Sequence, residues 1–201
     1  MSYIIVGLGN PGEGYEGTRH NVGRMVLEKL RKGQDWPEWK LDKKIRSLVS
    51  KGKMGVGEKA QAVTLAMPET MMNNSGKALV SLVESKKQAE KLVVVYDDLD
   101  LALGAMKVSW NRGDGGHRGL ASIIRLLKTR EFVRVRIGVS PTTPGGKLKK
   151  PPTETKVLDF ILGDFRDKEK IVFKKVAKCA VEALTTIVAD GRERAMNQFN
   201  K

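Results

Sequence analysis

YIIVGLGNPG (residues 3–12) joins an uninterrupted apolar segment directly to a glycine-rich turn. An apolar run without alternation is typical of a strand buried on both faces, and we predict that this strand covers residues 3–8. Three later segments, residues 62–67, 92–96 and 133–139, are also predicted to be strands that could be buried on both faces. Amphipathic stretches lie between the first and the third of these strands. They indicate crossover helices, and therefore an α/β fold with a largely parallel or mixed sheet.

Four segments are predicted to be helices: residues 21–32, 75–84, 119–128 and 168–189. The last has the clearest pattern, because its apolar residues recur at helical spacing and Gly191 follows its end. Asp164 or Asp167 is its expected N-cap. The lysine-containing segment 141–152 is rich in proline and glycine, which predicts an exposed, mobile loop. Because no repeat or interdomain linker is visible, we expect residues 1–201 to form a single domain.

The composition excludes several classes of protein. The chain has 201 residues, of which 40% are hydrophobic and 30% charged, unlike disordered or collagen-like chains. Its one cysteine, Cys179, has no internal disulfide partner, which favours a reducing compartment. We find neither a signal peptide nor an apolar run long enough to span a membrane. The net charge of +14 indicates nucleic acid or an anionic membrane surface as partner, unless the protein is simply basic.

Polar segments follow three of the predicted strands. Residues 7–10 follow the first strand, residues 68–73 the second and residues 97–100 the third. In open α/β sheets, functional sites form outside the carboxyl ends of the strands. We therefore expect these segments to share one crevice.

The first turn, GLGNPG of residues 7–12, matches the G-x-G-x-x-G pattern of dinucleotide-binding folds. That motif requires a helix to begin at the third glycine and an acidic residue about 20 residues later. Here Pro11 and the glycines around it favour a loop, and residues 29–33 contain no acidic side chain. A nicotinamide-dependent oxidoreductase is therefore not expected. We interpret the turn as one that glycine permits and that lifts the Asn10 amide into the crevice.

His20 is the candidate general base, because it and His117 are the two histidines of the chain. Held by Asp97 or Asp100, its ring could activate a water molecule, whereas a capping or surface role is the alternative. The aspartates could instead bind Mg²⁺ or form a solvated turn. In an extended chain Asp98 and Asp100 point to one side and Asp97 to the other, which gives Asp97 a separate role. A closed zinc site is not expected, because the two histidines are far apart in the sequence and only one cysteine is present.

A glycine-rich polar loop, residues 111–119, precedes the third predicted helix. Its backbone N–H groups could hold a phosphate or an oxyanion, although a flexible connector would have the same composition. No P-loop or nucleophile-elbow motif is found. Ser75 is therefore expected to cap the helix that follows it.

Several short motifs also occur together in a fixed order. They are GLGNPG (7–12), Tyr15, TRHN (18–21), PETMMNNSG (68–76), DDLD (97–100), GGHRG (115–119), RVRIG (134–138) and AMN (195–197). Each motif is weak alone, but the ordered set strongly resembles the bacterial-type peptidyl-tRNA hydrolases from residue 3 to about Asn197.

The resemblance implies a single α/β domain with a twisted, mixed and mostly parallel central sheet flanked by helices. It also implies an enzyme that hydrolyses the ester between a peptide, or an N-blocked amino acid, and the 3′-terminal ribose of tRNA. His20 would deprotonate the attacking water, and Asp97 would orient His20 and stabilise its charged form. The resemblance assigns substrate contacts to Asn10, Tyr15, Met72, Asn73 and Arg118. Asn10 and Asn73 would also help to stabilise the oxyanion, so that neither metal nor cofactor is required.

The chain departs from the family pattern beside the expected site. Arg118 stands where the family usually has an asparagine that contacts the substrate and the catalytic water, and arginine offers donors but no acceptor. Tyr96 and Asp114 stand where many relatives have histidine. The peptide contact is therefore expected to differ at this end of the cleft.

The tRNA contacts are expected from Lys107, Arg112 and Arg136. Ser109 replaces a lysine that, with the counterpart of Arg136, is thought to clamp the 5′-phosphate of tRNA. Lys107 lies on the same strand face and would rebuild the clamp. The expected partner is the acceptor stem and 3′ end of peptidyl-tRNA. The protein is expected to act in translation as a cytoplasmic monomer, and to bind neither DNA nor membrane. The alternative is a catalytically altered RNA-binding factor on the same fold.

Overall fold

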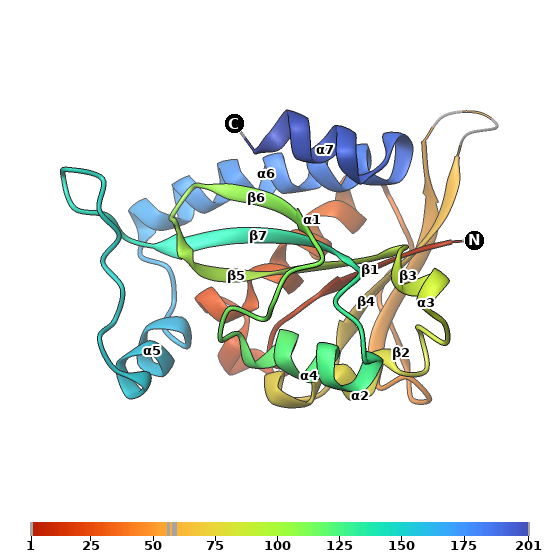
Figure 1. The fold of residues 1–201 in the computed structure, drawn as a ribbon, viewed down its shortest axis with the longest axis horizontal. Coiled ribbons are helices and arrows are strands. Elements are labelled where there is room, and N and C mark those ends of the chain that lie inside the picture. The colour runs from red at the N-terminus through yellow and green to blue at the C-terminus, as the bar shows by residue number, and fades with distance from the viewer. Residues whose placement is uncertain (1, 56, 58–59, 201) are drawn as a thin grey trace.

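The computed structural model describes residues 2–55, 57 and 60–200 and contains a seven-stranded sheet (Figure 1). The strands are β1 (Tyr3–Gly7), β2 (Lys40–Asp42), β3 (Ser47–Met54), β4 (Gln61–Pro68), β5 (Leu92–Ala102), β6 (Met106–Trp110) and β7 (Val133–Ser140). They lie in the order β2-β3-β4-β1-β5-β7-β6. β1 pairs in parallel with β4 and β5, and β5 with β7, whereas β2, β3 and β6 join by antiparallel pairing. The expected mixed sheet with a parallel centre is confirmed.

All four strands expected from the apolar runs are present, and β5 continues past Tyr96 to Ala102. The antiparallel strands β2 and β3 lie within a stretch for which the pattern predicted crossover helices. β2 is fully exposed, and β3 mixes buried with exposed residues, so that no continuous apolar run marks either strand.

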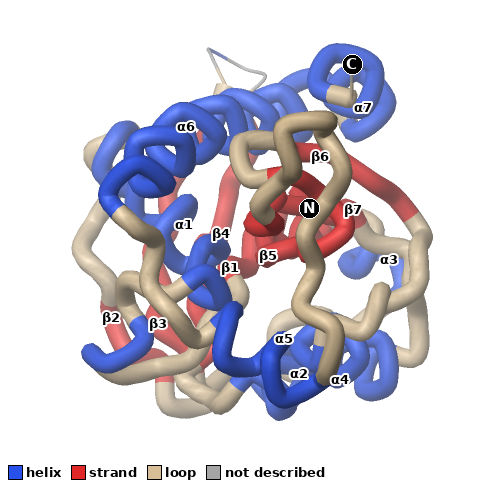
Figure 2. The backbone as a smooth tube through the Cα atoms, turned by 90° about the vertical axis from the view of Figure 1, so that its left-hand side faces the viewer, coloured by secondary structure: helices blue, strands red, loops and turns tan. Residues whose placement is uncertain are grey.

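Helices cover both faces of the sheet. They are α1 (Val22–Gly33), α2 (Ser75–Leu79), α3 (Lys86–Ala89), α4 (Arg118–Leu127), α5 (Glu154–Ile161), α6 (Asp167–Asp190) and α7 (Arg192–Phe199). α1, α6 and α7 pack on one apolar face, and α2 and α4 pack on the other, as Figures 1 and 2 show. Among the described residues, no helix combines the length and hydropathy needed to cross a membrane.

The helix predicted over residues 75–84 is shorter than expected. It ends at Leu79, and residues 80–85 contain two valines and two serines, which form helices poorly. Ser85 instead caps α3 by accepting the N–H of Gln88. The prediction that Ser75 caps α2 is wrong, because its hydroxyl donates to the Met72 carbonyl oxygen at 2.8 Å.

The start of α6 also differs from the prediction. The N-cap is Arg166, whose backbone N–H donates to the Glu169 carboxylate at 2.8 Å. Asp167 is already the first helical residue, and Asp164 forms a β-bridge with Thr18. Neither aspartate is therefore the cap.

The segment of residues 141–152 forms a loop that projects at the left of Figure 1. A bridge between Thr142 and Leu148 closes its tip, and Lys147, Lys149 and Lys150 are exposed. The predicted exposed basic loop is confirmed, and its mobility stays a prediction.

Close backbone packing between α1 and the centre of the sheet positions the functional residues. A Cβ atom on Gly23 would lie 2.3 Å from the Val95 carbonyl oxygen, and one on Gly7 would lie 2.4 Å from the Gly23 carbonyl oxygen. These glycines let the first turn of α1 sit directly on the carboxyl end of β1 and on Val95 of β5. His20 and Asn21, which immediately precede α1, are thereby brought to the polar segments that follow the strands.

Candidate active site

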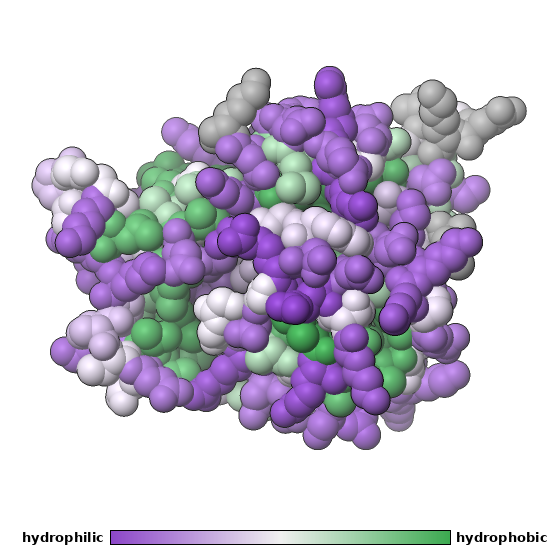
Figure 3. Space-filling view, viewed as in Figure 1, coloured by the Kyte–Doolittle hydropathy of each residue, from purple (hydrophilic) through white to green (hydrophobic). Residues whose placement is uncertain are grey.

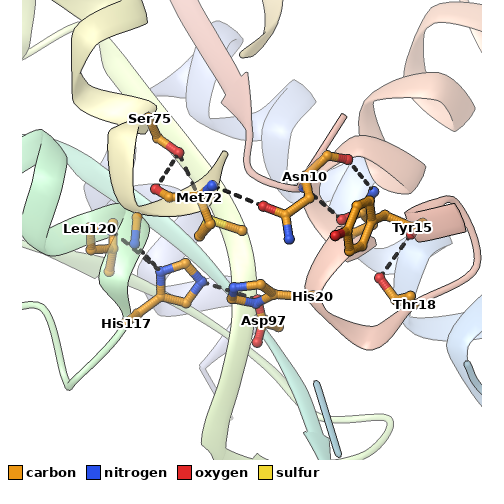
Figure 4. Close-up of polar contacts among 11 residues, drawn as sticks. Asn10, Tyr15, Thr18, His20, Met72, Ser75, Asp97, His117 and Leu120 are labelled. Carbon is orange, nitrogen blue, oxygen red and sulfur yellow. Dashed lines mark hydrogen bonds and ion pairs between the residues drawn. The ribbon is translucent and has the colours of Figure 1, made fainter. Parts of the chain in front are cut away.

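The turn after β1 presents Asn10 in a fixed orientation. The Asn10 backbone N–H donates to Asn21 Oδ1 at 2.8 Å, and Asn21 Nδ2 donates back to the Asn10 carbonyl oxygen at 2.9 Å. Asn10 Oδ1 accepts the Met72 backbone N–H at 2.8 Å (Figure 4). Because the side-chain oxygen is occupied by a donor, Asn10 Nδ2 keeps both of its hydrogens for another acceptor. The turn thus fixes the Asn10 amide, and its position in the crevice stays a prediction.

His20 and Asp97 are in direct contact. His20 Nδ1 lies 2.8 Å from Asp97 Oδ1, and both side chains are buried. Burial alone would raise the pKa of Asp97, but its contacts with the His20 and His117 rings hold the pKa of this carboxyl well below its usual range. An ionised Asp97 accepts a hydrogen bond from His20 Nδ1–H. The lone pair of His20 Nε2 then has no partner among the described residues and is available for proton abstraction.

His117 has a role that the sequence reasoning missed. Its Nδ1 accepts the backbone N–H groups of Gly119 (3.1 Å) and Leu120 (3.3 Å), and His117 thereby caps α4. Its Nε2 also lies 3.1 Å from Asp97 Oδ1. The ring centroids of His20 and His117 are 5.0 Å apart. The scarcity of histidine was the one sequence signal that could have linked the two.

The side chains of His20, Asp97 and His117 are not arranged as metal ligands in this structure. Atoms of His20, Asp97 and His117 lie within 4.8 Å of one another, so the two histidines are close in space despite their separation in the sequence. Their contacts of 2.8 and 3.1 Å, however, join the prospective ligands to each other as hydrogen bonds. Both nitrogens of His117 are engaged, because Nδ1 accepts two backbone N–H groups.

The Asp97–Asp100 segment also does not form the Mg²⁺ site considered as an alternative. Asp97 faces the two imidazoles, Asp98 accepts from Arg136 Nε at 2.7 Å, and Asp100 pairs with Lys150. Each carboxylate thus has its own positively polarised partner. The predicted separation of Asp97 from the other two aspartates is confirmed.

A cleft of about 130 Å³ lies against His20, Asp97 and His117. Three apolar residues of α5 line its other side: Val157, Leu158 and Ile161. Arg118, at the start of α4, lines the rim and forms an ion pair with Glu154 at the start of α5. The position that departs from the family pattern therefore joins the two walls of the cleft.

The other predicted substrate contacts occupy different surroundings. Tyr15 is half-buried beside Asn10, and its carbonyl oxygen accepts the Thr18 hydroxyl at 2.8 Å (Figure 4). Met72 is buried and takes part through its backbone N–H. Asn73 is exposed, and its Oδ1 accepts from Asn74 Nδ2 at 3.2 Å. None of these four residues, Asn10, Tyr15, Met72 and Asn73, belongs to the described lining of the cleft, and Asn10 lines a separate hollow.

The expected tRNA contacts form one group, here called the basic edge: Lys107, Arg112 and Arg136. They line a common hollow, and Lys107 lies directly opposite Arg136 in the β6–β7 register. Arg136 is tied to Asp98, one residue beyond Asp97. The basic edge is therefore continuous with the carboxylate side of the cleft.

Arg134 is a buried arginine that the sequence did not single out. It is completely buried, donates to the carbonyl oxygens of Arg130 and Arg112, and packs over the Phe132 ring at 4.3 Å. Burial lowers its pKa to about 10. Its contact with Arg112 fixes the start of the loop that leads to His117.

Comparisons with known proteins agree with these features. The family model described as peptidyl-tRNA hydrolase matches residues 4–201. A peptidyl-tRNA hydrolase of Caldanaerobacter subterraneus is 43% identical over 98% of this chain and 99% of its own length, and that of Aquifex aeolicus is 40% identical over 98% and 96%. The crystal structure of peptidyl-tRNA hydrolase from Acinetobacter baumannii superposes with a TM-score of 0.85 at 30% identity, covering 99% of this chain and 94% of that chain. The chain therefore belongs to the peptidyl-tRNA hydrolase family.

Proposed function

We propose that this enzyme hydrolyses the ester between a peptide and the 3′-terminal ribose of tRNA with a water molecule activated by His20. The observation that carries the proposal is the orientation of the His20 ring. Its Nδ1 is held by the ionised Asp97 at 2.8 Å, while Nε2 has no partner among the described residues. An imidazole held in this way is suited to general base catalysis, which typically contributes ~10²–10⁴ to the rate.

The reaction follows from the two fixed groups. His20 Nε2 takes a proton from water as the water oxygen attacks the ester carbonyl carbon. Asn10 Nδ2 donates to the oxygen that becomes negative in the tetrahedral intermediate, because Asn10 Oδ1 is already bound to Met72 N–H. As the intermediate collapses, the C–O bond to the ribose breaks and the imidazolium returns its proton to the departing 3′-oxygen. Asp97 stabilises the imidazolium between these steps.

The remaining substrate contacts are proposed in weaker roles. Tyr15 and Met72 border Asn10 and would shape the peptide side of the site. Arg118 is paired with Glu154, so a contact with the substrate would have to compete with that ion pair. Asn73 is exposed, and its proposed contact requires a substrate that extends beyond the cleft.

The basic edge supports binding of the tRNA acceptor stem. Lys107 and Arg112 are exposed, and cations on this side would meet phosphates next to a 3′ end held at His20. The face shown in Figure 3 is largely hydrophilic, with smaller apolar patches, and we propose that the protein acts as a monomer. We further propose that residues 1–201 act as a single domain in the cytoplasm, without metal or cofactor, and bind neither DNA nor membrane.

Release of the blocked amino acid from N-acetyl-aminoacyl-tRNA tests the proposal. We expect the wild-type chain to release it and His20→Ala to lose at least about a hundredfold in kcat. A matched control is Lys77→Ala on α2, which changes a side chain outside the described lining of the cleft. Undiminished activity of His20→Ala would refute the mechanism.

The alternative of an RNA-binding factor without catalysis is not favoured. This alternative was considered because Arg118 and Ser109 replace residues that are usual in the family. The proposed catalytic pair is nevertheless present, since His20 Nδ1 lies 2.8 Å from Asp97 Oδ1. Tight, salt-dependent tRNA binding without ester cleavage in the same assay would restore that alternative.

A further inference from the structure

We infer that His117 is a positioning residue, which ties the Asp97 carboxylate to the N-terminus of α4 and so holds His20 in its catalytic orientation. The inference rests on the proposed roles of His20 and Asp97. Capping α4 uses only Nδ1 of His117, and the inference assigns a function in the reaction to the other ring nitrogen, Nε2.

The backbone of α4 determines the protonation of the His117 ring. Its Nδ1 lies 3.1 Å from the Gly119 nitrogen and 3.3 Å from the Leu120 nitrogen, and backbone N–H groups can only donate. Nδ1 must therefore carry a lone pair, and the ring proton resides on Nε2. This nitrogen is the one that faces Asp97 Oδ1, at 3.1 Å. His117 is thus a neutral donor to the carboxylate.

Asp97 depends on its two imidazole partners. It is 3% exposed, and its Oδ1 receives both His20 Nδ1 and His117 Nε2. A buried carboxylate without sufficient donors is strongly destabilised. Losing His117 would leave His20 as its one partner among the described side chains, and the carboxylate would be free to turn.

The other charged groups around the cleft do not replace His117. On β5, Asp98 is paired with Arg136 and Asp100 with Lys150, and the Tyr96 ring meets His117 edge-on at 5.0 Å. The remaining ionisable groups of the lining are Asp114 in the loop, Arg118 on α4 and Glu154 on α5, of which the last two pair with each other.

Two isosteric substitutions separate the cap from the contact with Asp97. The side-chain oxygen of asparagine takes the place of Nδ1, so His117→Asn keeps an acceptor for the α4 N–H groups but does not reach Asp97. The amide nitrogen of glutamine takes the place of Nε2, so His117→Gln keeps a donor to Asp97 but loses the cap. Each variant therefore retains one of the two functions of the ring.

Steady-state kinetics on N-acetyl-aminoacyl-tRNA between pH 5 and 9 provides the main readout. For His117→Asn we expect kcat to fall roughly tenfold, as for a lost hydrogen bond to a charged group, with KM within about twofold. The acidic limb of its pH profile should move to higher pH, because more of the Asp97 charge then favours protonated His20. For His117→Gln we expect kcat within about threefold, an unchanged acidic limb, and a Tm lower by about 2–4 °C from the lost cap.

Nitrogen-15 NMR of the histidine rings gives an independent signature. It should show His117 protonated on Nε2 at pH 7.5, and a proton on Nδ1 would overturn the inference. The inference would also fail if His117→Asn kept the wild-type kcat, if it raised only KM, or if both variants lost kcat in proportion to Tm. Activity of His20→Ala equal to wild type would instead refute the proposed catalytic base, and so distinguishes the two failures.

Discussion

The residues proposed for catalysis are buried and hydrogen-bonded, whereas two of the three residues of the basic edge are exposed. Asn10, His20 and Asp97 are at most 6% exposed, and each is hydrogen-bonded within the site. Lys107 and Arg112, in the basic edge, are exposed. Chemistry requires reacting atoms in a fixed geometry, whereas attraction of a polyanion acts over a Debye length of about 10 Å. The contrast indicates that the first region sets the rate of ester cleavage and the second sets affinity for tRNA.

Asn10→Asp is expected to have the largest effect among changes that test this contrast without removing His20. The new carboxylate has the shape of the amide and still accepts the Met72 N–H, but it replaces the Nδ2 donor with a negative oxygen. We expect kcat to fall by ~10²–10³ on any ester substrate, the usual cost of losing an oxyanion donor. The control is Asn197→Asp, the same change at an exposed residue of α7. An unchanged kcat for Asn10→Asp would remove Asn10 from the proposed mechanism.

Asp97→Asn should have the next largest effect. Both imidazoles contact Oδ1, so the amide oxygen of asparagine can keep both hydrogen bonds while the charge is lost. We expect kcat to fall roughly ten- to hundredfold. The acidic limb of the pH profile should move to lower pH, because protonated His20 loses its counter-charge. A limb that moves to higher pH would contradict the assigned role.

The same substitution should change the pH dependence of stability. The pKa of Asp97 lies below its ordinary value of about 3.9 in the folded protein, so its contribution is fully present above that pH and is lost as the pH falls below it. Urea unfolding should therefore show a difference between wild type and Asp97→Asn that shrinks as the pH falls below about 4. A difference that does not shrink below about pH 4 would show that the carboxyl is not stabilised in its charged form.

The smallest effect is expected for Lys147→Ala combined with Lys149→Ala in the projecting loop. Both side chains are exposed, so each would contribute through phosphate contacts alone. We expect KM for tRNA to rise severalfold at low salt, and the salt dependence of binding to become shallower by about 0.9 per lost contact. A fall in kcat for a short nucleotidyl ester would instead place these lysines at the reaction centre.

The sequence predicted the parts of the fold that repeat a simple pattern. The apolar runs of β1, β4 and β5 identify the sheet centre, and glycines near residue 7 permit the turn that carries Asn10. β2 and β3 lack such a run, since they lie towards one edge of the sheet and mix exposed with buried residues. Their pairing depends on β4, which no local pattern reveals.

The site was predicted in part, for similar reasons. The contact between His20 and Asp97 follows from the convergence of strand ends and from the family resemblance. The contact of His117 with the same carboxylate depends on how α4 packs beside β5, which spacing along the chain does not express. Arg134 alternates with valines and would be expected to face solvent like other arginines. It is buried because the Arg112 and Arg130 carbonyl oxygens and the Phe132 ring surround it.

A comparison of two substrates tests the separation of chemistry from affinity most directly. The rates of Asn10→Asp and of Lys107→Ala combined with Arg112→Ala would be measured on N-acetyl-aminoacyl-tRNA and on a short nucleotidyl ester, at low and high salt. We predict that Asn10→Asp loses the same factor on both substrates at either salt concentration. The basic-edge variant should lose activity on tRNA alone, through KM, and the loss should shrink at high salt. An equal loss on the short ester would contradict the account, because these cations would then act on the reaction itself.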